Sequence, residues 1–375
     1  MEPPRESIIA SISAPRLEAF FNALDTPTRA QCDEHSLSLT GRNYCMATAS
    51  QGCHSYTLIC YDQATPHTPI PDGEAQNQIV QFRLASSELK MGRLASASDV
   101  HGPIVPRTQY SGRFGNLLVY TMEAIPGVTP REIFPESPTM DLRHEILHEQ
   151  FMKDLALYFA NCFKSMQGEV TDLLPQLERM GKMHERLKKL PESSIAPYCA
   201  RHVPEMTKAA SIVYDVLQMR TLTHGDLNMT NFLIDPVTYH ITGIVDWASA
   251  ELTPFGLELY VVQLATGYYT AAGKGPFVFY DNHRHLKKVF WNELFELLAK
   301  PPHSRRDYVD EYWRPSWMLG LILREGFVHA ADGSLKDEIV PLCEENLVQL
   351  QQLQTFLDDE DFFDAALDDE VDVTE

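Results

Sequence analysis

The sequence lacks three features that mark whole classes of protein. It has no cluster of lysines or arginines dense enough to follow a phosphate backbone, so we expect neither nucleic acid nor an anionic membrane as a partner. It has no apolar run that approaches the length of a membrane span. Its first residues, MEPPRESIIASIS, carry two glutamates and no basic start, so we expect no secretory signal.

Paired cysteines are also missing. The seven cysteines are odd in number and scattered along the chain, and no two of them form a CxxC pair. This pattern argues against a disulfide framework or a zinc site and is typical of free thiols in a reducing compartment. We therefore expect a cytoplasmic protein.

The composition is that of a soluble globular protein, with 44% hydrophobic and 22% charged residues in a chain of 375. The formal net charge is -21, and residues 358–375 contribute ten acids and no base. We expect this acidic end to be a disordered tail. The alternative is a docking segment that contacts a protein through Phe362, Phe363 and Leu367.

Two kinds of sequence follow one another along the chain. Residues 1–34 are expected to form an N-terminal extension with one short helix. From 35 to 123 the chain offers short runs rich in aromatic and β-branched residues, namely SLSLTGR, YCMATAS, YTLICYD, QIVQFRL and NLLVYTM. Glycine, proline and polar residues separate these runs, which predicts an antiparallel sheet, interrupted by a helix at about 87–98.

Residues 124–357 are predicted to be mainly helical, because apolar residues recur there at spacings of three and four. Helices are expected around 146–163 and at about 203–220, 257–268, 284–298, 308–328 and 344–356. The predicted fold class is therefore α+β, with a small antiparallel β lobe and a larger helical lobe. In such a fold the crevice between the lobes is the natural ligand site.

The stretch THGDLNMTNFLIDPVTYHITGIVDW, residues 223–247, carries the candidate chemistry. A turn at Asp235-Pro236 would pair its two apolar runs as a hairpin, which brings Asn231 and Asp246 to the same end. One amide oxygen and one carboxylate there suit a magnesium ion that takes its other ligands from water and phosphates. Asp226 could then orient a substrate hydroxyl and accept its proton during phosphoryl transfer. The alternative is a polar loop followed by an ordinary hairpin.

HGDLNMTNFLID followed by ITGIVDWASA resembles the signature of the aminoglycoside phosphotransferase and choline kinase superfamily, which has a protein-kinase-like fold. The resemblance to the wider pattern covers roughly residues 35–265. It implies that Asp226 is the catalytic aspartate, that Asn231 and Asp246 bind magnesium, and that ATP is the phosphoryl donor. His224 would organise the loop, and Trp247 would be a packing residue. The motif differs from the His-Arg-Asp and Asp-Phe-Gly of the protein kinases.

The same resemblance extends to two segments of the β-rich half. NLLVYTMEAIPG, residues 116–127, resembles the strand and hinge whose backbone, from Met122 to Ala124, would face the adenine; the alternative is a buried strand and a Pro-Gly turn. QIVQFRL resembles the strand that carries a phosphate-binding lysine, but here the position holds Arg83, which is not equivalent to lysine. Glu88 is the candidate partner of Arg83 on the following helix, and a solvated first-turn glutamate is the alternative.

A nucleotide-covering loop is predicted at SLTGRNYCMAT, residues 38–48, between two strands. It has one glycine, Gly41, where protein kinases have several, and Arg42 and Asn43 add donors for phosphate oxygens. A plain hairpin turn is the alternative.

The acceptor site is expected among the helices after Trp247, where acidic and aromatic side chains would suit an amine-bearing alcohol. The residues available there are Glu251, Glu258, Tyr268, Tyr269, Asp310, Glu311, Trp313 and Trp317. Glu258 is expected to be structural, and for each of the others the alternative is a helix face or a core position.

Together these patterns predict an ATP- and Mg²⁺-dependent O-phosphotransferase that acts on a small hydroxylated metabolite. The alternative function is a non-catalytic relative that binds a nucleotide or a protein partner. The missing strand lysine and the acidic tail favour that alternative, whereas the complete set of Asp226, Asn231 and Asp246 favours catalysis.

Overall fold

The chain divides into two compact units in a computed structural model that describes residues 17–22, 26–48, 51, 54–62, 77–165, 174–207, 220–273, 275–298, 309–329, 335–359 and 361–367. The described residues of the first, the sheet unit, lie within Met1–Pro126 and Gly243–Ala248. Those of the second, the helical unit, lie within Gly127–Thr242, Ser249–His329 and Leu335–Glu375. The predicted α+β class, with a small antiparallel sheet and a larger helical part, is confirmed.

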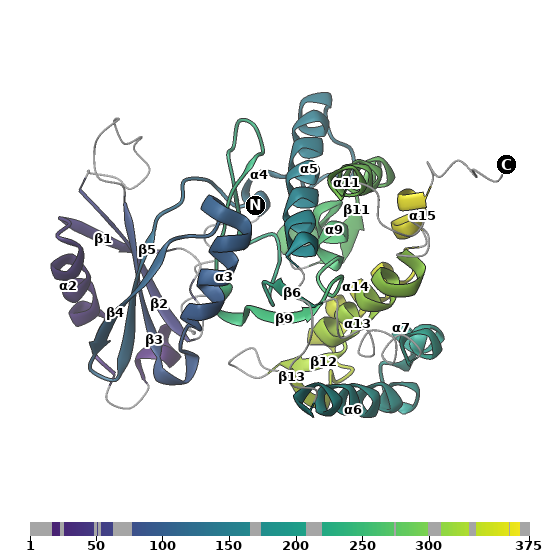
Figure 1. The fold of residues 1–375 in the computed structure, drawn as a ribbon, viewed down its shortest axis with the longest axis horizontal. Helices are drawn as coiled ribbons and strands as arrows, with labels where there is room; N and C mark the ends of the chain where they lie inside the picture. The colour runs from purple at the N-terminus through teal and green to yellow at the C-terminus, as the bar shows by residue number, and fades with distance from the viewer. Residues whose placement is uncertain are drawn as a thin grey trace. The chain divides into compact units, whose positions relative to one another are not determined.

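The sheet unit contains one five-stranded antiparallel sheet of order β1-β2-β3-β5-β4 (Figure 1). The strands are β1 (Tyr44–Ala47), β2 (Ser55–Tyr61), β3 (Gln78–Leu84), β4 (Thr108–Phe114) and β5 (Leu117–Glu123). β3 has the bounds that the sequence predicted, whereas β4 was expected to be a connection. The strand predicted at SLSLTGR is wrong, because helix α2 (Arg29–Thr40) covers most of it. Thr28 and Gln31 form a capping box that begins this helix, and their local bonding outweighs the strand-like alternation that follows.

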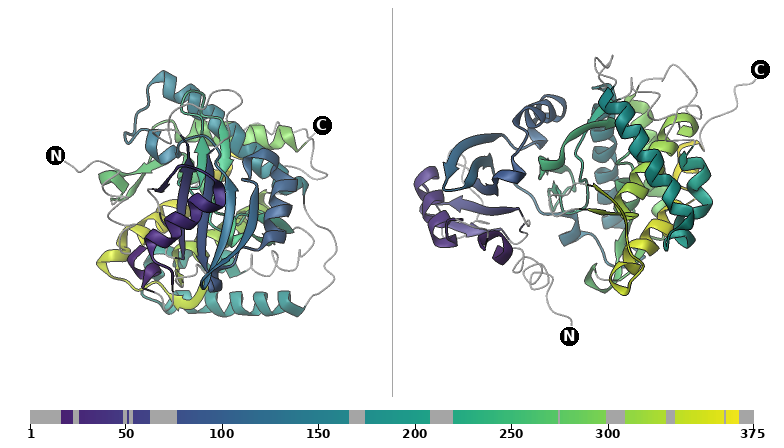
Figure 2. Two further views of the ribbon diagram at one scale, coloured as in Figure 1. Left: turned by 90° about the vertical axis from the view of Figure 1, so that its left-hand side faces the viewer. Right: turned by 90° about the horizontal axis from the view of Figure 1, so that it is seen from below.

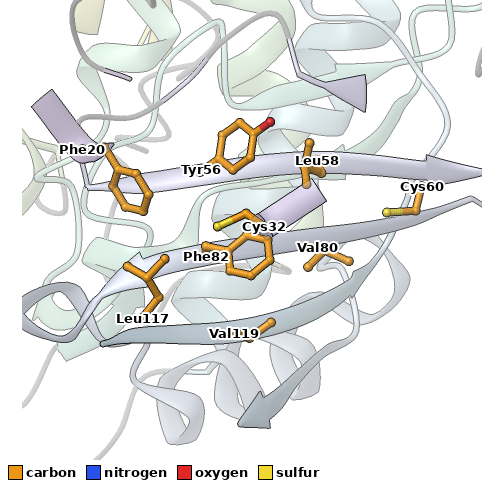
Figure 3. Close-up of a cluster of buried hydrophobic side chains, with 9 residues drawn as sticks. All are labelled: Phe20, Cys32, Tyr56, Leu58, Cys60, Val80, Phe82, Leu117 and Val119. Carbon is orange, nitrogen blue, oxygen red and sulfur yellow. The ribbon is translucent and has the colours of Figure 1, made fainter. Parts of the chain in front are cut away.

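Helix α2 lies on one face of the sheet and belongs to its core (Figures 1 and 2). The buried cluster of this face, shown in Figure 3, consists of Phe20, Cys32, Tyr56, Leu58, Cys60, Val80, Phe82, Leu117 and Val119. The described residues 17–22 and 26–40 therefore belong to the sheet unit. Successive side chains of a strand point to opposite faces, so Arg83, next to Phe82, points away from this cluster.

The opposite face of the sheet meets the segment that leads into α3 (Met91–His101). The short helical turns η1 (Ala85–Ser87) and η2 (Gly102–Ile104) flank this helix. The backbone N–H of Leu89 donates to the hydroxyl of Tyr120 over 3.2 Å, which holds the segment against β5. The helix begins at Met91, so the prediction that Glu88 lies on it is wrong.

The remaining elements are helices and two-stranded sheets. The helices are α4 (Pro130–Ile133), α5 (Leu142–Lys164), α6 (Leu174–Lys189), α7 (Ala196–Cys199), α9 (Tyr260–Ala265), α10 (Thr270–Gly273), α11 (His283–Leu297), α13 (Arg314–Glu325), α14 (Leu347–Leu357) and α15 (Asp361–Leu367). Short helical turns are η3 (Leu190–Glu192), η4 (Ala200–His202), η5 (Trp247–Ser249), η6 (Val309–Trp313) and η7 (Glu344–Asn346). The paired strands are β6 (Arg220–Thr223) with β9 (Glu251–Pro254), β7 (Phe232–Ile234) with β8 (Ile241–Ile244), β10 (Gly267–Tyr269) with β11 (Phe277–Phe279), and β12 (Phe327–His329) with β13 (Leu335–Ile339).

Most of the predicted helices are found, with shifted ends. Helices α5, α9, α11, α13 and α14 fall within or close to predicted ranges. The helix expected at 203–220 is helical at 203–207 and lies outside the described residues at 208–219, while Arg220 opens β6 instead. In the part of the chain that the structure describes, no helix is long and apolar enough to cross a membrane. The six described cysteines are free thiols.

The prediction of a disordered acidic tail from residue 358 is wrong for the described residues 358–359 and 361–367. Helix α15 packs along α11, and Phe362 and Phe363 are buried there. Asp359 pairs with Lys287 of α11 through both carboxylate oxygens, at 2.8 and 2.7 Å. The prediction relied on the number of acids in the segment. It did not weigh the two aromatic residues that are buried, nor the pairing of Asp359 with the buried Lys287. Residues 368–375 lie outside the described residues.

His148 joins α5 to α9 in the interior of the helical unit. Its side chain is fully buried, packs against the rings of Phe134 and Tyr280, and places Nε2 2.6 Å from the carbonyl oxygen of Ala265. Burial lowers the pKa of His148 from 6.5 to about 4, and the bond to Ala265 opposes this shift. The folded protein therefore keeps this imidazole neutral at pH values at which the unfolded chain binds a proton.

We predict that His148 makes the protein less stable as the pH falls from about 6.5 to about 4. Across this window the unfolded chain gains a proton that the folded chain does not, which lowers the unfolding free energy by on the order of 3 kcal/mol. In His148→Gln the amide can still donate to Ala265 but does not titrate, so this part of the decline should vanish. Urea unfolding at pH 7 and pH 4 measures it, with the exposed His240→Gln as the control. An equal decline in wild type and His148→Gln would contradict the prediction.

Candidate active site

The loop after β6 carries two of the predicted site residues, Asp226 and Asn231. Strand β6 pairs antiparallel with β9, with Thr223 opposite Glu251, so the loop leaves β6 beside the start of β9. Gly225 has a φ of +84°, and a Cβ at this position would lie 2.2 Å from the carbonyl oxygen of Ser249. Any side chain would collide with that backbone, which explains the glycine of the His-Gly-Asp motif.

Glu258 holds the loop through hydrogen bonds to its backbone, in the structural role that the sequence predicted. Its side chain is buried, and its two carboxylate oxygens accept the N–H of His224 over 3.0 Å and the N–H of Gly225 over 2.6 Å. Burial raises the pKa of Glu258, and the interactions with His224 and the two N–H groups oppose this shift. Both oxygens act as acceptors, which is the bonding of an ionised carboxylate.

The carboxylate of Asp226 is held on one side and open on the other. Its backbone N–H donates to Nδ1 of His224 over 3.3 Å. Its Oδ1 accepts from Nη1 of Arg324 over 3.2 Å and from Nδ2 of Asn228 over 3.4 Å. Among the described residues its Oδ2 has no hydrogen-bond partner, and the side chain is 49% exposed. One oxygen of the predicted catalytic aspartate is thus available to a substrate.

Asn231 is buried at the start of the hairpin and is bound to the same loop. Its Nδ2 donates to the carbonyl oxygen of Asp226 over 2.8 Å, and its backbone N–H donates to the carbonyl oxygen of Asn228 over 3.0 Å. Because the amide nitrogen is engaged, the amide oxygen is the atom that a metal ion would use. The turn predicted at Asp235-Pro236 is found, with Oδ1 of Asp235 accepting from two backbone N–H groups.

Arg324 and Tyr260 are site residues that reasoning from the sequence missed. Arg324 of α13 donates from Nη1 to Asp226 and, over 3.1 Å, to the hydroxyl of Tyr260. That hydroxyl donates to the carbonyl oxygen of Leu227 over 3.1 Å. The available signal was the pair Arg324-Glu325 at the end of the apolar run LGLIL, because charges inside a buried helix need partners.

Asp246 follows β8 and has an unusual backbone conformation. Its φ is +65°, in the left-handed region that residues other than glycine rarely adopt, although aspartate tolerates it better than most. The next residue, Trp247, is buried, as predicted: its Nε1 donates to the carbonyl oxygen of Ile244 over 2.8 Å, and its ring lies 5.6 Å from that of His101. Such strained residues concentrate at functional sites.

Asp226 and Asn231 belong to the helical unit, whereas Asp246 belongs to the sheet unit. The pairing of Asn231 with Asp246 around one magnesium ion stays a prediction. Within the described ranges no three His, Cys, Asp or Glu side chains gather closely enough to hold a metal ion. A site of one amide oxygen, one carboxylate and substrate phosphates is of a different kind, and the chemistry of these two residues fits magnesium.

Arg83 is buried in β3 and bound to its own surroundings. Its Nε donates to the carbonyl oxygen of Ser87 over 2.7 Å, and its Nη1 donates to Oε1 of Gln81 over 2.9 Å. Glu88 is exposed in the segment between η1 and α3. The role of both residues toward a nucleotide stays a prediction.

The segment predicted as a nucleotide-covering loop, residues 38–48, does not lie between two strands. Gly41 has a φ of +67° and ends α2, donating its N–H to the carbonyl oxygen of Leu37 over 2.9 Å, so it does not lie between two strands. Arg42 and Asn43 bind the carboxylate of Asp62, at 2.5 and 3.1 Å. The argument that assigned Gly41 to a nucleotide therefore loses its structural basis.

Met122 and Ala124 lie at the end of β5. Met122 pairs with Ile79 of β3 and with Thr108 of β4, and Ala124 follows the strand. Met122 also lines a hollow of about 530 Å³ at this end of the sheet. The other lining residues are Arg42, Asn77, Gln78, Arg107, Thr108, Gln109, Thr121 and Glu123. An adenine contact at Met122 and Ala124 stays a prediction.

The residues proposed as acceptor-site walls do not all face solvent. Trp313 and Trp317 are buried core residues, which was the alternative interpretation of these positions. Tyr269 is partly buried and donates to Oε1 of Gln352 over 2.7 Å, and Tyr268 stacks on Tyr280 with ring centres 5.5 Å apart. Glu251, Asp310 and Glu311 are exposed. These positions do not define one acidic and aromatic wall.

The sequence model of the phosphotransferase enzyme family matches residues 87–280. No curated protein sequence matches the chain.

Three solved structures are among those that resemble the chain. An aminoglycoside-3'-phosphotransferase of type VIII is 16% identical, with 76% of this chain and 98% of that chain covered and a TM-score of 0.44. An ethanolamine kinase from Plasmodium vivax is 11% identical, with 93% and 94% covered and a TM-score of 0.46. A choline kinase from Cryptosporidium parvum Iowa II is 10% identical, with 84% and 88% covered and a TM-score of 0.49. Similarity at this level identifies no substrate.

We predict that Glu258→Gln lowers the unfolding free energy by about 1–3 kcal/mol. The amide nitrogen cannot accept a hydrogen bond, so one of the buried N–H groups of His224 and Gly225 loses its partner. Urea unfolding at pH 7 measures the effect, and Glu251→Gln, at an exposed position, is the matched control. A Glu258→Gln variant as stable as wild type would show that these bonds do not hold the loop.

Proposed function

This chain belongs to the phosphotransferase enzyme family, and we propose that it is an ATP- and Mg²⁺-dependent O-phosphotransferase acting on a hydroxyl group of a small metabolite. The observation that carries the proposal is the geometry of Asp226. Its backbone is fixed by His224 and Asn231, its Oδ1 is bound by Arg324, and its Oδ2 is open. A carboxylate held in this way can orient a hydroxyl without further reorganisation.

Asp226 acts on the acceptor in this proposal. Its Oδ2 accepts a hydrogen bond from the substrate hydroxyl, which directs the hydroxyl oxygen at the γ-phosphorus of ATP. As the new P–O bond forms, the bond from the γ-phosphorus to the bridging oxygen breaks, ADP leaves, and the hydroxyl proton passes to Asp226. Positioning and charge neutralisation supply most of the rate in such a transfer.

Asn231 and Asp246 are the proposed magnesium ligands. The amide oxygen of Asn231 is directed by the bond from its nitrogen to the Asp226 carbonyl, and this bond couples the metal ligand to the catalytic loop. The left-handed backbone at Asp246 is compatible with a functional constraint at that residue. A bound magnesium ion would neutralise charge on the phosphates of ATP.

Arg83 takes the place of the strand lysine in this proposal and binds phosphate oxygens. The bonds to Ser87 and Gln81 support it, because they fix the guanidinium on the sheet face opposite the α2 core. Arginine is permanently charged and binds oxyanions through a planar fork, so it can supply the charge with a different geometry. A contact of the adenine with the backbone from Met122 to Ala124 belongs to the same proposal.

The walls of the site do not indicate an acceptor class. The structural neighbours include kinases named for aminoglycosides, ethanolamine and choline, so these compounds and simple sugars form the first panel of acceptors. The scattered cysteines support a cytoplasmic location for such a metabolic enzyme.

A non-catalytic, nucleotide-binding relative is the rival function. Two corrections support it: Gly41 caps a helix, and Glu88 precedes α3. Against it stands the organisation of Asp226, which a binding protein does not require. Catalysis remains the better supported function.

The proposal is tested by thermal unfolding with ATP, with and without Mg²⁺, together with ADP release in the presence of the acceptor panel. A ligand that binds only the folded state raises the midpoint. We expect a Mg²⁺-dependent rise in wild type that is lost in Asp246→Asn, a variant that tolerates the left-handed backbone. Asp226→Asn should keep the rise and lose turnover, because it loses the proton acceptor and no metal ligand.

Asp99→Asn, at an exposed position on α3, is the control and should behave as wild type. Normal turnover in Asp226→Asn would overturn its catalytic role. A Mg²⁺-dependent rise without ADP release from wild type would favour the non-catalytic relative, and no rise at millimolar ATP would refute the nucleotide site.

A further inference from the structure

The loop from Asp226 to Asn231 contains no cationic side chain of its own. Its intervening residues are Leu227, Asn228, Met229 and Thr230. The positive charge beside Asp226 instead comes from Arg324 of α13, whose Nη1 lies 3.2 Å from Oδ1 of Asp226. A residue 98 positions away in the sequence thus supplies the positive charge that the loop lacks.

Arg324 is itself held firmly by its neighbours. Its Nε pairs with Oε1 of Glu325 over 3.1 Å, and its guanidinium lies 4.9 Å from the ring centre of Tyr260. Glu325 is buried, and its backbone carbonyl accepts from Gln349 of α14 over 3.0 Å. The guanidinium is therefore fixed by Glu325 and by the ring and hydroxyl of Tyr260, in addition to its bond with Asp226.

The contacts of Arg324 make the two carboxylate oxygens of Asp226 different from one another. Oδ1 is directed by Arg324 and, at longer range, by Asn228, whereas Oδ2 has no hydrogen-bond partner among the described residues. The second bond of Nη1, to Tyr260, continues to the Leu227 carbonyl and so holds the next residue of the loop. Side chain and backbone of the loop are anchored by one guanidinium group.

We propose that Arg324 is the positioning residue of the phosphoryl transfer: it holds Oδ1 of Asp226 so that Oδ2 faces the acceptor hydroxyl. This inference rests on the proposed function. Arg324 does not touch the reacting atoms and takes no proton. Its contribution is orientation, so its loss should lower kcat and leave the KM for ATP nearly unchanged.

The test measures ADP release from MgATP, with water and with the acceptor panel, in wild type and variants of the full chain. We expect Arg324→Gln to lower kcat about 100-fold, the scale of a misplaced catalytic group. Arg324→Lys keeps the charge but not the planar fork, so its loss should be smaller. Arg314→Gln, on the same helix and paired with Asp310, is the matched control and should keep wild-type kcat.

Chemical rescue separates positioning from folding. In Arg324→Ala, added methylguanidinium should restore part of the lost kcat, because the side chain of Arg324 is 28% exposed and the space it leaves can admit the ion. Tetramethylammonium at equal ionic strength should not. If Arg324→Gln and Arg324→Ala fail to fold, Tyr260→Phe removes the hydroxyl between Arg324 and Leu227 and should lower kcat with the KM for ATP unchanged.

The outcomes are distinguishable. ADP release by wild type with an undiminished kcat in Arg324→Gln, or in a folded Tyr260→Phe when the Arg324 variants do not fold, refutes the role of Arg324 alone. A reduced kcat with no rescue by methylguanidinium also refutes positioning and assigns the loss to the fold. No ADP release by wild type, with water or with any member of the acceptor panel, refutes the proposed function and this inference together.

Discussion

The carboxylate of Glu258 is the constraint on which the candidate site depends. An ionised acid in the interior is costly unless each oxygen has a partner, and here the partners are the backbone N–H groups of His224 and Gly225. The loop cannot shift without leaving this charge unpaired. Gly225 packs directly against the backbone of Ser249, with no room for a Cβ. This close packing fixes the backbone from which the side chain of Asp226 extends.

The same requirement explains why a few polar residues interrupt apolar helices. Arg324 and Glu325 pair with one another at the end of α13, and Arg324 continues to Asp226. Gln263 in the buried helix α9 accepts from Nε1 of Trp317 and donates to Asp359. Gln263 and Arg324 thus each link separate elements, so these polar contacts specify which elements meet, while the apolar contacts supply most of the burial.

The sequence predicted those features that short-range rules determine. The bounds of β3, the turn at Asp235 and the burial of Trp247 follow from alternation, turn chemistry and a local contact. Gly41 was wrongly predicted to lie between two strands. The residues before it alternate like a strand, but they continue helix α2, whose capping box lies further upstream. Arg324 was missed because no local pattern relates it to Asp226; only the packing of α13 beside α9 and the loop brings the two together.

The acidic C-terminal segment shows why charge counts alone misjudge order. Asp359 is nearly inaccessible to solvent, yet it is matched by Lys287, which also contacts the ring of Phe279. Phe362 adds a backbone carbonyl that accepts from Nε1 of Trp291 and a ring that packs beside Trp317. Asp358 and Asp361, which are more exposed than Asp359, pair with Arg201 and Arg284. Paired acids and two buried aromatic rings therefore hold the described part of this segment in place. The informative quantity is therefore the number of acids with a fixed partner, and that number is set by the helices on which the segment lies.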